Sequence, residues 1–328
     1  MTERQNCRLQ RLLLVSIWCL ELLCVLKYIS LINSGPINIP LPQATMPINL
    51  PPTIKFNYER PPVVETVVGV QFDRLSHFTN AHLGAFWHYI GVDNWPTTLD
   101  ASPLTSQFER FHDSSKWGGG FNLQLTQDPS SRLQLKNHDG SRMLQIQNGR
   151  MHHNWLGEEG GDYPRYEAVR DEFEKSLRSF IAFASNHKLG RMVPNQWEMT
   201  YVNHIEKGSV WNSPSDWGFF SLLRDVPTID DVIDAESFAG EWHFVIPGQR
   251  GRLHIDWKHA HKFPATDDAQ QFIRLTFTAR GAIEKSDDIL STVRQGLDLG
   301  HGTIVNSFSR LMSDEANHYW GFQHAINR

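Results

Sequence analysis

An alternation of apolar and polar residues is the clearest pattern in the chain, and it runs from residue 121 to residue 156. Four segments follow it: F-N-L-Q-L-T-Q, R-L-Q-L-K, M-L-Q-I-Q and R-M-H-H-N-W-L. Because successive side chains of a strand point to opposite faces, this period predicts strands that each bury one face. Asp139-Gly140 and Asn148-Gly149 separate the last three segments, and such pairs tolerate the positive φ angles of tight hairpins. We therefore predict an antiparallel meander.

A period of three to four residues predicts the long helices. Apolar residues recur at this spacing from Tyr166 to Ala184, which indicates one long helix with a buried stripe. Asp162 or Tyr163 would cap this helix, with Pro164 in the first turn, where its missing N–H costs nothing. A similar stripe after Ser286 predicts a second long helix.

Weaker patterns predict elements along the rest of the chain. Strands are expected at residues 63–72, 194–206, 241–246, 252–262 and 271–280, and short helices at residues 79–90, at 215–223 and after Ser313. Residues 91–120 are rich in Pro, Ser, Asp and Gly, so we expect an ordered loop with one helical turn there.

The order of the predicted elements repeats along the chain. Residues 63–190 read β-α-ββββ-α, and residues 194–312 read β-α-βββ-α. We therefore predict an α+β fold of two tandem β-α-β(3-4)-α repeats, at residues 63–190 and 191–328. Each repeat would be an antiparallel sheet packed by a long helix, because neither element can bury its apolar face alone. The element order resembles helix-grip and TATA-binding-like half domains, which carries no function. Ahead of the repeats, residues 46–62 are proline-rich and are expected to form an extended linker.

An apolar segment at residues 12–32 allows three interpretations. Its aliphatic residues favour membrane insertion by about 6 kcal/mol, whereas Glu21 and Lys27 oppose it by about 5 kcal/mol, so it is a marginal membrane anchor. A secretory signal is weak because no small-residue cleavage site follows. We favour the third interpretation, in which residues 1–45 are an over-extended start and translation begins at Met46.

Composition restricts the class of protein and its compartment. The chain of 328 residues is 40% hydrophobic and 20% charged, which excludes wholesale disorder. Its net charge of −5 provides no basic surface, so no nucleic-acid partner is expected. The three cysteines are Cys7, Cys19 and Cys24, so the globular part can hold neither disulfides nor cysteine metal sites. We expect a cytoplasmic protein, with an N-terminal membrane anchor as the alternative.

The strand-to-helix corner after residue 150 contains the densest group of candidate site residues. Asn154, Arg165 and Glu167 could line a polar pocket, and Trp155 and Tyr163 would form its roof. Arg165 could hold a carboxylate or phosphate through two parallel hydrogen bonds. The alternative, which we favour, is that Arg165 and Glu167 are a cap and an ion pair that lock the bend.

His301 lies between Gly300 and Gly302 within the second long helix. Each glycine costs the helix about 1 kcal/mol relative to alanine, so we expect the glycines to allow close packing. His301 would then bond to a buried partner. The functional alternative is a general base or a residue of the binding pocket.

The group His254-x-Asp256 and His259-x-His261 suggests a metal site at first sight. In a regular strand, however, the first pair faces one side of the sheet and the second pair the other, so we predict no metal site. No sequence motif indicates a cofactor or an assembled set of catalytic residues.

Five segments carry a family resemblance. They are P-P-V-V-E-T-V-V-G-V-Q-F at 61–72, I-Q-N-G-R-M-H-H-N-W at 146–155, Y-P-R-Y-E at 163–167, Y-V-N-H-I at 201–205 and H-G-T-I-V-N-S-F-S-R-L-M-S-D-E-A-N-H-Y-W-G at 301–321. With these segments the chain resembles a sporadically distributed bacterial family of uncharacterised proteins. The resemblance implies a bacterial origin and an accessory gene context, and it implies no activity.

We therefore expect a non-enzymatic binding or interaction module that acts with a partner protein in a bacterial accessory system. The alternative is a hydrolase-like enzyme whose site joins Asn154, Arg165, Glu167 and His301 from separate elements.

Overall fold

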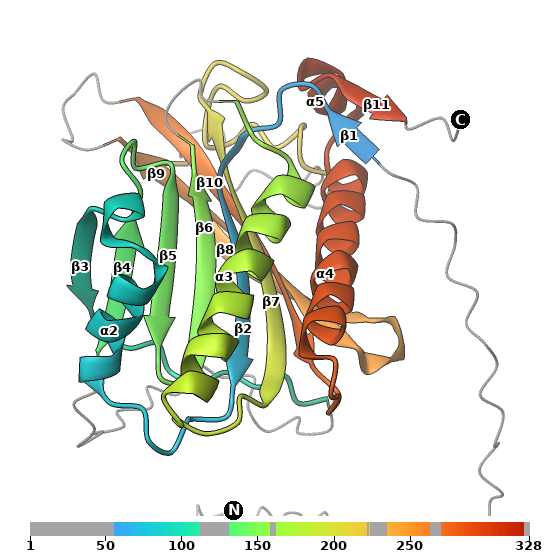
Figure 1. Ribbon diagram of the computed structural model, residues 1–328. Helices are drawn as coiled ribbons and strands as arrows, with labels where there is room; N and C mark the ends of the chain where they lie inside the picture. The colour runs from blue at the N-terminus through green and yellow to red at the C-terminus, as the bar shows by residue number, and fades with distance from the viewer. Residues whose placement is uncertain are drawn as a thin grey trace, which may run out of the picture. The chain divides into compact units, whose positions relative to one another are not determined.

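An antiparallel sheet is the central element of the structure (Figure 1). The computed structural model describes residues 56–111, 131–157, 162–221, 223, 235–262 and 270–324, all within one compact unit, Pro51–Arg328. Among these residues nine strands form the sheet, in the spatial order β3 (Thr97–Ala101), β4 (Arg132–Lys136), β5 (Arg142–Gln147), β6 (Arg150–Leu156), β2 (Val63–Phe72), β7 (Pro194–Glu206), β10 (Gln271–Ala282), β9 (Gly251–His261) and β8 (Ala239–Ile246). The predicted α+β class with antiparallel strands is confirmed.

The helices α2 (Asn80–Ile90), α3 (Tyr166–Asn186) and α4 (Ile289–Leu311) cover one face of this sheet (Figure 1). α3 packs on β6 and β2, α4 packs on β7 and β10, and α2 packs against α3. Most of the α3 stripe that the sequence predicted is buried, with Val169, Phe173, Leu177 and Phe180 each 0% exposed. Ile181 is partly buried. The main core therefore lies between the sheet and its helices.

The two predicted halves share a single sheet. β2 and β7 pair antiparallel, from Val63 opposite Asn203 to Phe72 opposite Pro194. The expectation of a separate sheet in each half is thus corrected. If the halves formed two separate sheets, β2 and β7 would each be left with unpaired backbone N–H and C=O groups at an edge. Pairing β2 with β7 gives these groups hydrogen-bond partners.

The start of α3 differs from the prediction. Its N-cap is Arg165, with φ of 72° and ψ of 157°, so neither Asp162 nor Tyr163 caps the helix. This backbone conformation cannot continue into a helix, which explains why α3 begins at Tyr166 and not at Pro164. The other N-caps agree better with the sequence, since Asp288 caps α4 and Ser313 caps α5 (Asp314–Tyr319).

The segments at residues 91–127 and 215–223 agree only in part with the predicted elements. β3 forms within the predicted loop at residues 91–120, where its exposed T-T-L-D-A sequence shows no alternation. The expected helical turn there is the short helix η1 (Val92–Asn94). The strand predicted at residues 121–127 lies outside the described residues. Residues 215–221 consist of turns, irregular backbone and a single β-bridge from Phe220 to Met312, so the described part of the helix expected at 215–223 is not helical.

The last part of the expected linker is a packed strand. β1 (Phe56–Tyr58) pairs antiparallel with β11 (Phe322–His324). Tyr58 is buried against Phe308, and its hydroxyl donates a hydrogen bond of 2.6 Å to Asn317 Oδ1. One buried aromatic residue thus anchors a segment that the surrounding prolines indicated as extended. Residues 1–55, including the apolar segment at 12–32, lie outside the described residues.

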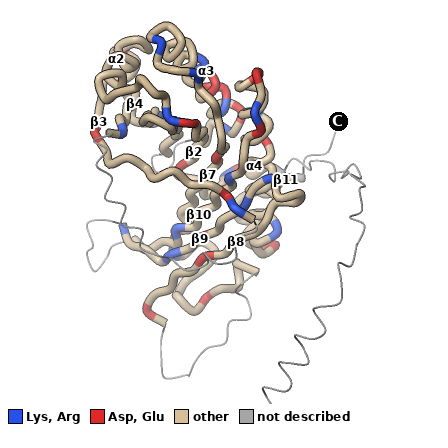
Figure 2. The backbone as a smooth tube through the Cα atoms, turned by 90° about the horizontal axis from the view of Figure 1, so that it is seen from below, with Lys and Arg blue, Asp and Glu red and all other residues tan. Residues whose placement is uncertain are grey.

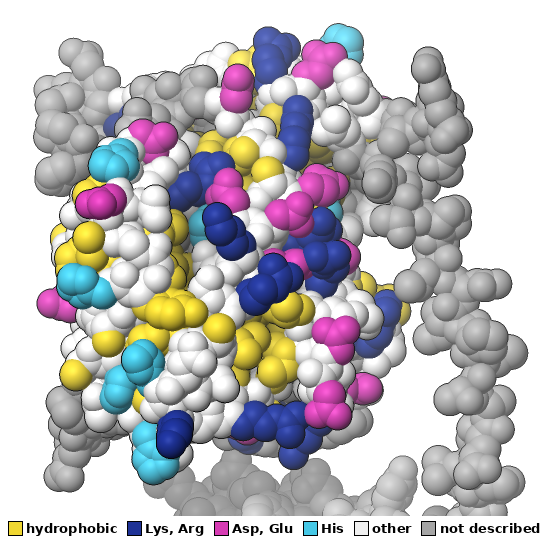
Figure 3. Space-filling view, viewed as in Figure 1, with side chains coloured by type: hydrophobic (Ala, Val, Ile, Leu, Met, Phe, Trp, Pro, Cys, Tyr) yellow, Lys and Arg dark blue, Asp and Glu magenta, His cyan; other side chains and the backbone are white. Residues whose placement is uncertain are grey.

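Charged residues of both signs are interspersed along the described chain (Figure 2), and their side chains are interspersed over the helix-bearing face (Figure 3). On that face Arg142 pairs with Glu172 at 2.5 Å, and Arg170 pairs with Asp298 at 3.1 Å. None of the described helices combines the length and the apolar character needed to cross a membrane.

Candidate functional site

A pocket opens on the helix-bearing side, between the start of α3, the middle of α4 and the segment that joins β1 to β2. Its volume is about 530 Å³. Its lining is Asn57, Tyr58, Pro61, Pro62, Val63, Tyr163, Arg165, Tyr166, Glu167, Arg170, Tyr201, Asn203, Asp298, His301, Gly302, Ile304, Val305, Asn306 and Phe308. Sites for small organic ligands commonly occupy roughly 300–1,000 Å³, so this pocket is of suitable size.

Four of the six candidate residues line this pocket together: Tyr163, Arg165, Glu167 and His301. The first three are close in sequence, at the beginning of α3. His301 comes from α4, more than 130 positions away, and tertiary packing alone brings it to them.

The other two candidates lie elsewhere. Trp155 is behind the pocket, with its ring centroid 5.2 Å from that of Tyr163. Because Trp155 points toward the helices, its neighbour Asn154 points to the opposite face of the sheet. There the Asn154 amide donates a hydrogen bond of 2.6 Å to Glu65 Oε1 and accepts one of 2.9 Å from Gln145.

A chain of hydrogen bonds connects three side chains of the pocket. The Tyr163 hydroxyl donates to the Tyr201 hydroxyl at 2.9 Å, and Tyr201 Oη lies 2.8 Å from His301 Nδ1. Which of these two atoms donates depends on the ring nitrogen of His301 that carries the proton. The His301 ring also stacks on Tyr166, with a centroid distance of 4.1 Å and an interplanar angle of 8°.

The tyrosines of the pocket keep their protons. Burial raises the pKa of Tyr163 to about 12, against a smaller lowering by its bond to Tyr201. Burial likewise raises the pKa of Tyr201 well above its ordinary value. Burial and the hydrogen bond to Asp298 raise the pKa of Tyr166. These phenols therefore act as hydrogen-bonding groups and not as bases.

Arg165 has a structural role that the sequence analysis anticipated only in part. Its guanidinium donates to Asn57 Oδ1 at 3.0 Å and to the Tyr58 carbonyl oxygen at 2.8 Å, so it ties β1 to the corner of α3. It occupies the N-cap position, but its side chain makes no capping hydrogen bond, and no ion pair joins Arg165 to Glu167 in the described part of the chain, so the favoured alternative of a cap and an ion pair is not confirmed. Glu167 is exposed at the rim of the pocket.

Sequence reasoning missed Tyr201, Tyr166, Asp298 and Arg170 as pocket residues. Tyr166 donates a hydrogen bond of 2.7 Å to Asp298 Oδ1, and Arg170 Nη1 lies 3.1 Å from the same oxygen. Tyr166 belongs to the apolar stripe of α3, so the helical pattern identified it only as a core residue. The available signal was its position in the Y-P-R-Y-E segment.

The two glycines beside His301 differ in their surroundings. A Cβ atom added at Gly300 would lie 2.8 Å from Trp197 Cζ3, whereas one added at Gly302 would meet nothing within 4 Å. The expected close packing thus applies to Gly300 alone. It lets α4 approach β7 closely enough for His301 to reach Tyr201.

The histidines of β9 lie on alternate faces, as predicted. His254 contacts Glu109 on the open face, whereas His259 stacks on Phe238 on the other side. Within the described ranges no group of three or more His, Cys, Asp and Glu residues is arranged to hold a metal ion.

Neither the comparison with protein-family models nor the search of curated proteins found a match for this chain. The fold and the pocket therefore define the class of protein: an antiparallel α+β protein with a tyrosine- and histidine-lined pocket on its helix side.

Proposed function

We propose that the protein is a binding module and that its ligand is a small organic molecule held in the pocket beside His301. The observation that carries the proposal is the preformed Tyr163–Tyr201–His301 chain at the wall of a cavity of about 530 Å³. Preorganised polar groups in a largely apolar cavity bind ligands without first paying the cost of ordering side chains.

The family resemblance supports the same pocket. Four of the five segments quoted for it contribute to the lining: the first, third, fourth and fifth. Their lining residues include Pro61, Pro62, Tyr163, Arg165, Tyr166, Glu167, Tyr201 and His301. Segments that carry a resemblance and also surround one cavity are more typical of a shared ligand site than of shared packing in the hydrophobic core.

The chemistry of the lining favours binding over catalysis. The described lining includes no Ser, Thr, Cys or Lys that could serve as a nucleophile. Its phenols remain protonated, and Arg165 holds the backbone of β1. The hydrolase-like alternative needs Asn154, which bonds to Glu65 on the opposite face of the sheet.

A ligand screen by thermal shift tests the proposal, with native mass spectrometry to detect small molecules that co-purify. We expect a ligand that raises the melting temperature of the wild type and fails to do so for His301→Ala. His88→Ala is the matched control, because His88 is an exposed histidine on α2 outside the pocket. A ligand that stabilises all three proteins equally would refute the pocket as its site.

We further propose that the chain contains two structural repeats. In each half the first strand is central and the strand before the long helix is its neighbour, since β6 lies next to β2 and β10 next to β7. An experimental structure in which β2, β6 and α3 failed to superpose on β7, β10 and α4 would overturn this.

The cellular setting is also a proposal: a cytoplasmic protein of a bacterial accessory system that acts with a partner protein. The family resemblance supports the bacterial accessory context, and the absence of cysteine from the globular part supports the compartment. Fractionation of native cells and affinity purification of the full chain would test it. Recovery in the membrane fraction, or recovery without any co-purifying protein, would count against it.

A further inference from the structure

Residues 104–110, called the strap below, cross the face of the sheet opposite the helices. The strap follows β3 and is neither helix nor strand. Six neighbouring strands each provide at least one side chain that holds it, among them Gln147 of β5, Arg150 of β6, Gln71 of β2, Gln196 of β7, Arg280 of β10 and Arg252 of β9. The strap thus runs across the strands as an extended peptide would run across a receptor.

Most of these bonds go to the backbone of the strap. Gln147 accepts from the Leu104 amide and donates to the Leu104 carbonyl, both at 2.8 Å. Gln71 accepts from the Gln107 amide at 2.9 Å, and Arg252 donates to the Arg110 carbonyl at 3.0 Å. Bonds of this kind do not depend on the side chains of the bound segment, so a different peptide could make them.

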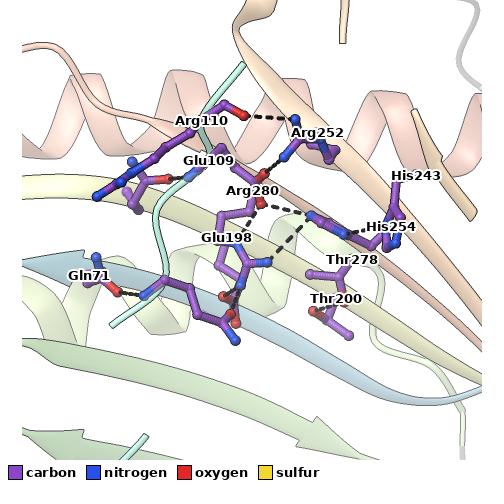
Figure 4. A network of polar contacts seen from close by, with 12 residues as sticks. Gln71, Glu109, Arg110, Glu198, Thr200, His243, Arg252, His254, Thr278 and Arg280 are labelled. Atoms are coloured by element: carbon purple, nitrogen blue, oxygen red, sulfur yellow. Dashed lines mark hydrogen bonds and ion pairs between the residues drawn. The ribbon is translucent and has the colours of Figure 1, made fainter. Parts of the chain in front are cut away.

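One side chain of the strap is buried deeply. The Glu109 carboxylate lies in a socket formed by Arg252, His254 and Arg280 (Figure 4). Its oxygens are 2.5 Å from Arg252 Nη1, 2.8 Å from His254 Nε2 and 3.0 Å from Arg280 Nε. The side chain of Glu109 is 5% exposed. Charge-assisted hydrogen bonds from several donors make this the specific contact of the strap.

The socket needs an acidic occupant. Without Glu109, the largely enclosed guanidinium groups of Arg252 and Arg280 would lose their charge-assisted bonds to this carboxylate, while Glu198 would remain 3.1 Å from Arg280. Removing one member of a charge pair from such a site is unfavourable, so the socket favours an acidic side chain as its occupant.

The rest of the strap buries little apolar surface. Phe108 is 50% exposed, and residues 105–107 are exposed as well. Its attachment therefore depends on polar contacts that an incoming peptide can reproduce, with a small loss of hydrophobic stabilisation.

We propose that this face of the sheet is a docking site for an extended segment of a partner protein that presents one acidic side chain. The strap occupies the site in the free protein, with Glu109 in the position of the partner's carboxylate. The site is separate from the pocket beside His301, because the two lie on opposite faces of the sheet. The strap and the partner's segment would therefore compete for the same site on the sheet.

A fluorescent peptide with the strap sequence L-T-S-Q-F-E-R tests the proposal. Glu109→Gln weakens the internal strap, and we expect this variant of the full chain to bind the peptide at least tenfold more tightly than the wild type. A peptide with Gln in place of its Glu should bind at least tenfold more weakly. Glu284→Gln, at an exposed position, is the matched control and should behave as the wild type. The proposal would be overturned if Glu109→Gln bound the two peptides equally, or if the wild type and Glu109→Gln bound the strap peptide equally.

A second measurement covers the case in which Glu109→Gln does not fold. Hydrogen exchange of the wild type is followed with and without excess peptide, and the peptide should accelerate exchange of the Leu104 and Gln107 amides. Unchanged exchange would overturn the proposal. Sedimentation provides a further check, because a dimer formed by Glu109→Gln with the wild type would assign the socket to the strap of a second copy instead of to a separate partner.

Discussion

The hydroxyl of Tyr201 lies 2.8 Å from Nδ1 of His301 and thereby joins the central strand β7 to the middle of α4. Tyr201 is 4% exposed, so the bond is formed where water cannot replace it. The same hydroxyl accepts from Tyr163 at the corner of α3. One phenol thus connects the sheet to both long helices at the wall of the pocket.

Replacement of Tyr201 by Phe tests the contribution of this phenol. The change removes two buried hydrogen bonds and retains the ring, so we expect the free energy of unfolding to fall by about 1–3 kcal/mol. Urea denaturation measures the loss. Tyr89→Phe, at an exposed tyrosine of α2, is the control and should change stability little. Equal effects of the two changes would contradict a special role for the Tyr201 hydroxyl.

The glycines that flank His301 form a matched pair for a second prediction. Gly300→Ala places a methyl group 2.8 Å from Trp197, and we expect it to destabilise the protein by about 1–3 kcal/mol. Gly302→Ala meets open space, so the better helix propensity of alanine should stabilise by up to about 1 kcal/mol. Thermal denaturation of both variants provides the comparison, and changes of the same sign would show that α4 does not pack this closely on β7.

Arg165 has a strained backbone, and its side chain donates two stabilising hydrogen bonds. Two substitutions separate the strain from the hydrogen bonds. Arg165→Ala loses the bonds to Asn57 and Tyr58 but retains the φ of 72°, so we expect a loss of about 1–3 kcal/mol. Arg165→Gly loses the same bonds and relieves the strain, which should make it more stable than Arg165→Ala by about 1 kcal/mol or more. Chemical denaturation would show the difference, and a glycine variant less stable than the alanine variant would contradict the strain.

The lowered pKa of Glu109 predicts that the folded protein loses stability in acid. Burial by itself would raise the pKa of this carboxyl, but the hydrogen bond and charge of His254, together with Arg280, lower it from 4.5 to about 2. Because the folded pKa is the lower one, the unfolded chain binds the proton more readily. The stabilisation is complete above pH 4.5 and is lost as pH falls toward 2, amounting to roughly 3 kcal/mol.

Denaturation of wild type and Glu109→Gln between pH 6 and 2 measures this contribution. The variant should be less stable at pH 6 and should show a shallower decline below pH 4.5. Parallel curves for the two proteins would mean that Glu109 does not contribute through its charge.

Local chemistry explains which elements were predictable. β2 and β7 have the bounds predicted for them, because β2 is rich in β-branched residues, β7 has apolar residues along one face, and proline stands at the start of each. Asn148-Gly149 forms the β5–β6 hairpin, with Gly149 at a φ of 103°. β3 has no such pattern, since its side chains are mostly exposed, and among the described residues it pairs through its backbone with β4 only.

The sequence grouped Tyr163, Arg165 and Glu167 as candidates because they share a corner. It named His301 as a separate candidate, and only packing shows which residues His301 meets. The membership of Tyr201 and Asp298 depends on how closely α4 approaches the sheet, which Gly300 and Trp197 decide. The strap gave no signal in the sequence, because its contacts come from six strands spread over more than 200 residues.

The sequence by itself determined the period of each strand and helix, the apolar face of α3, and the antiparallel α+β class, since these follow from short-range spacing. Only the tertiary structure decided that β2 pairs with β7 in one sheet, that His301 meets Tyr201, and that Glu109 enters a socket of Arg252, His254 and Arg280. The physical reason is that these contacts join segments far apart in the chain. Their energies depend on mutual burial and charge pairing, which no local pattern encodes.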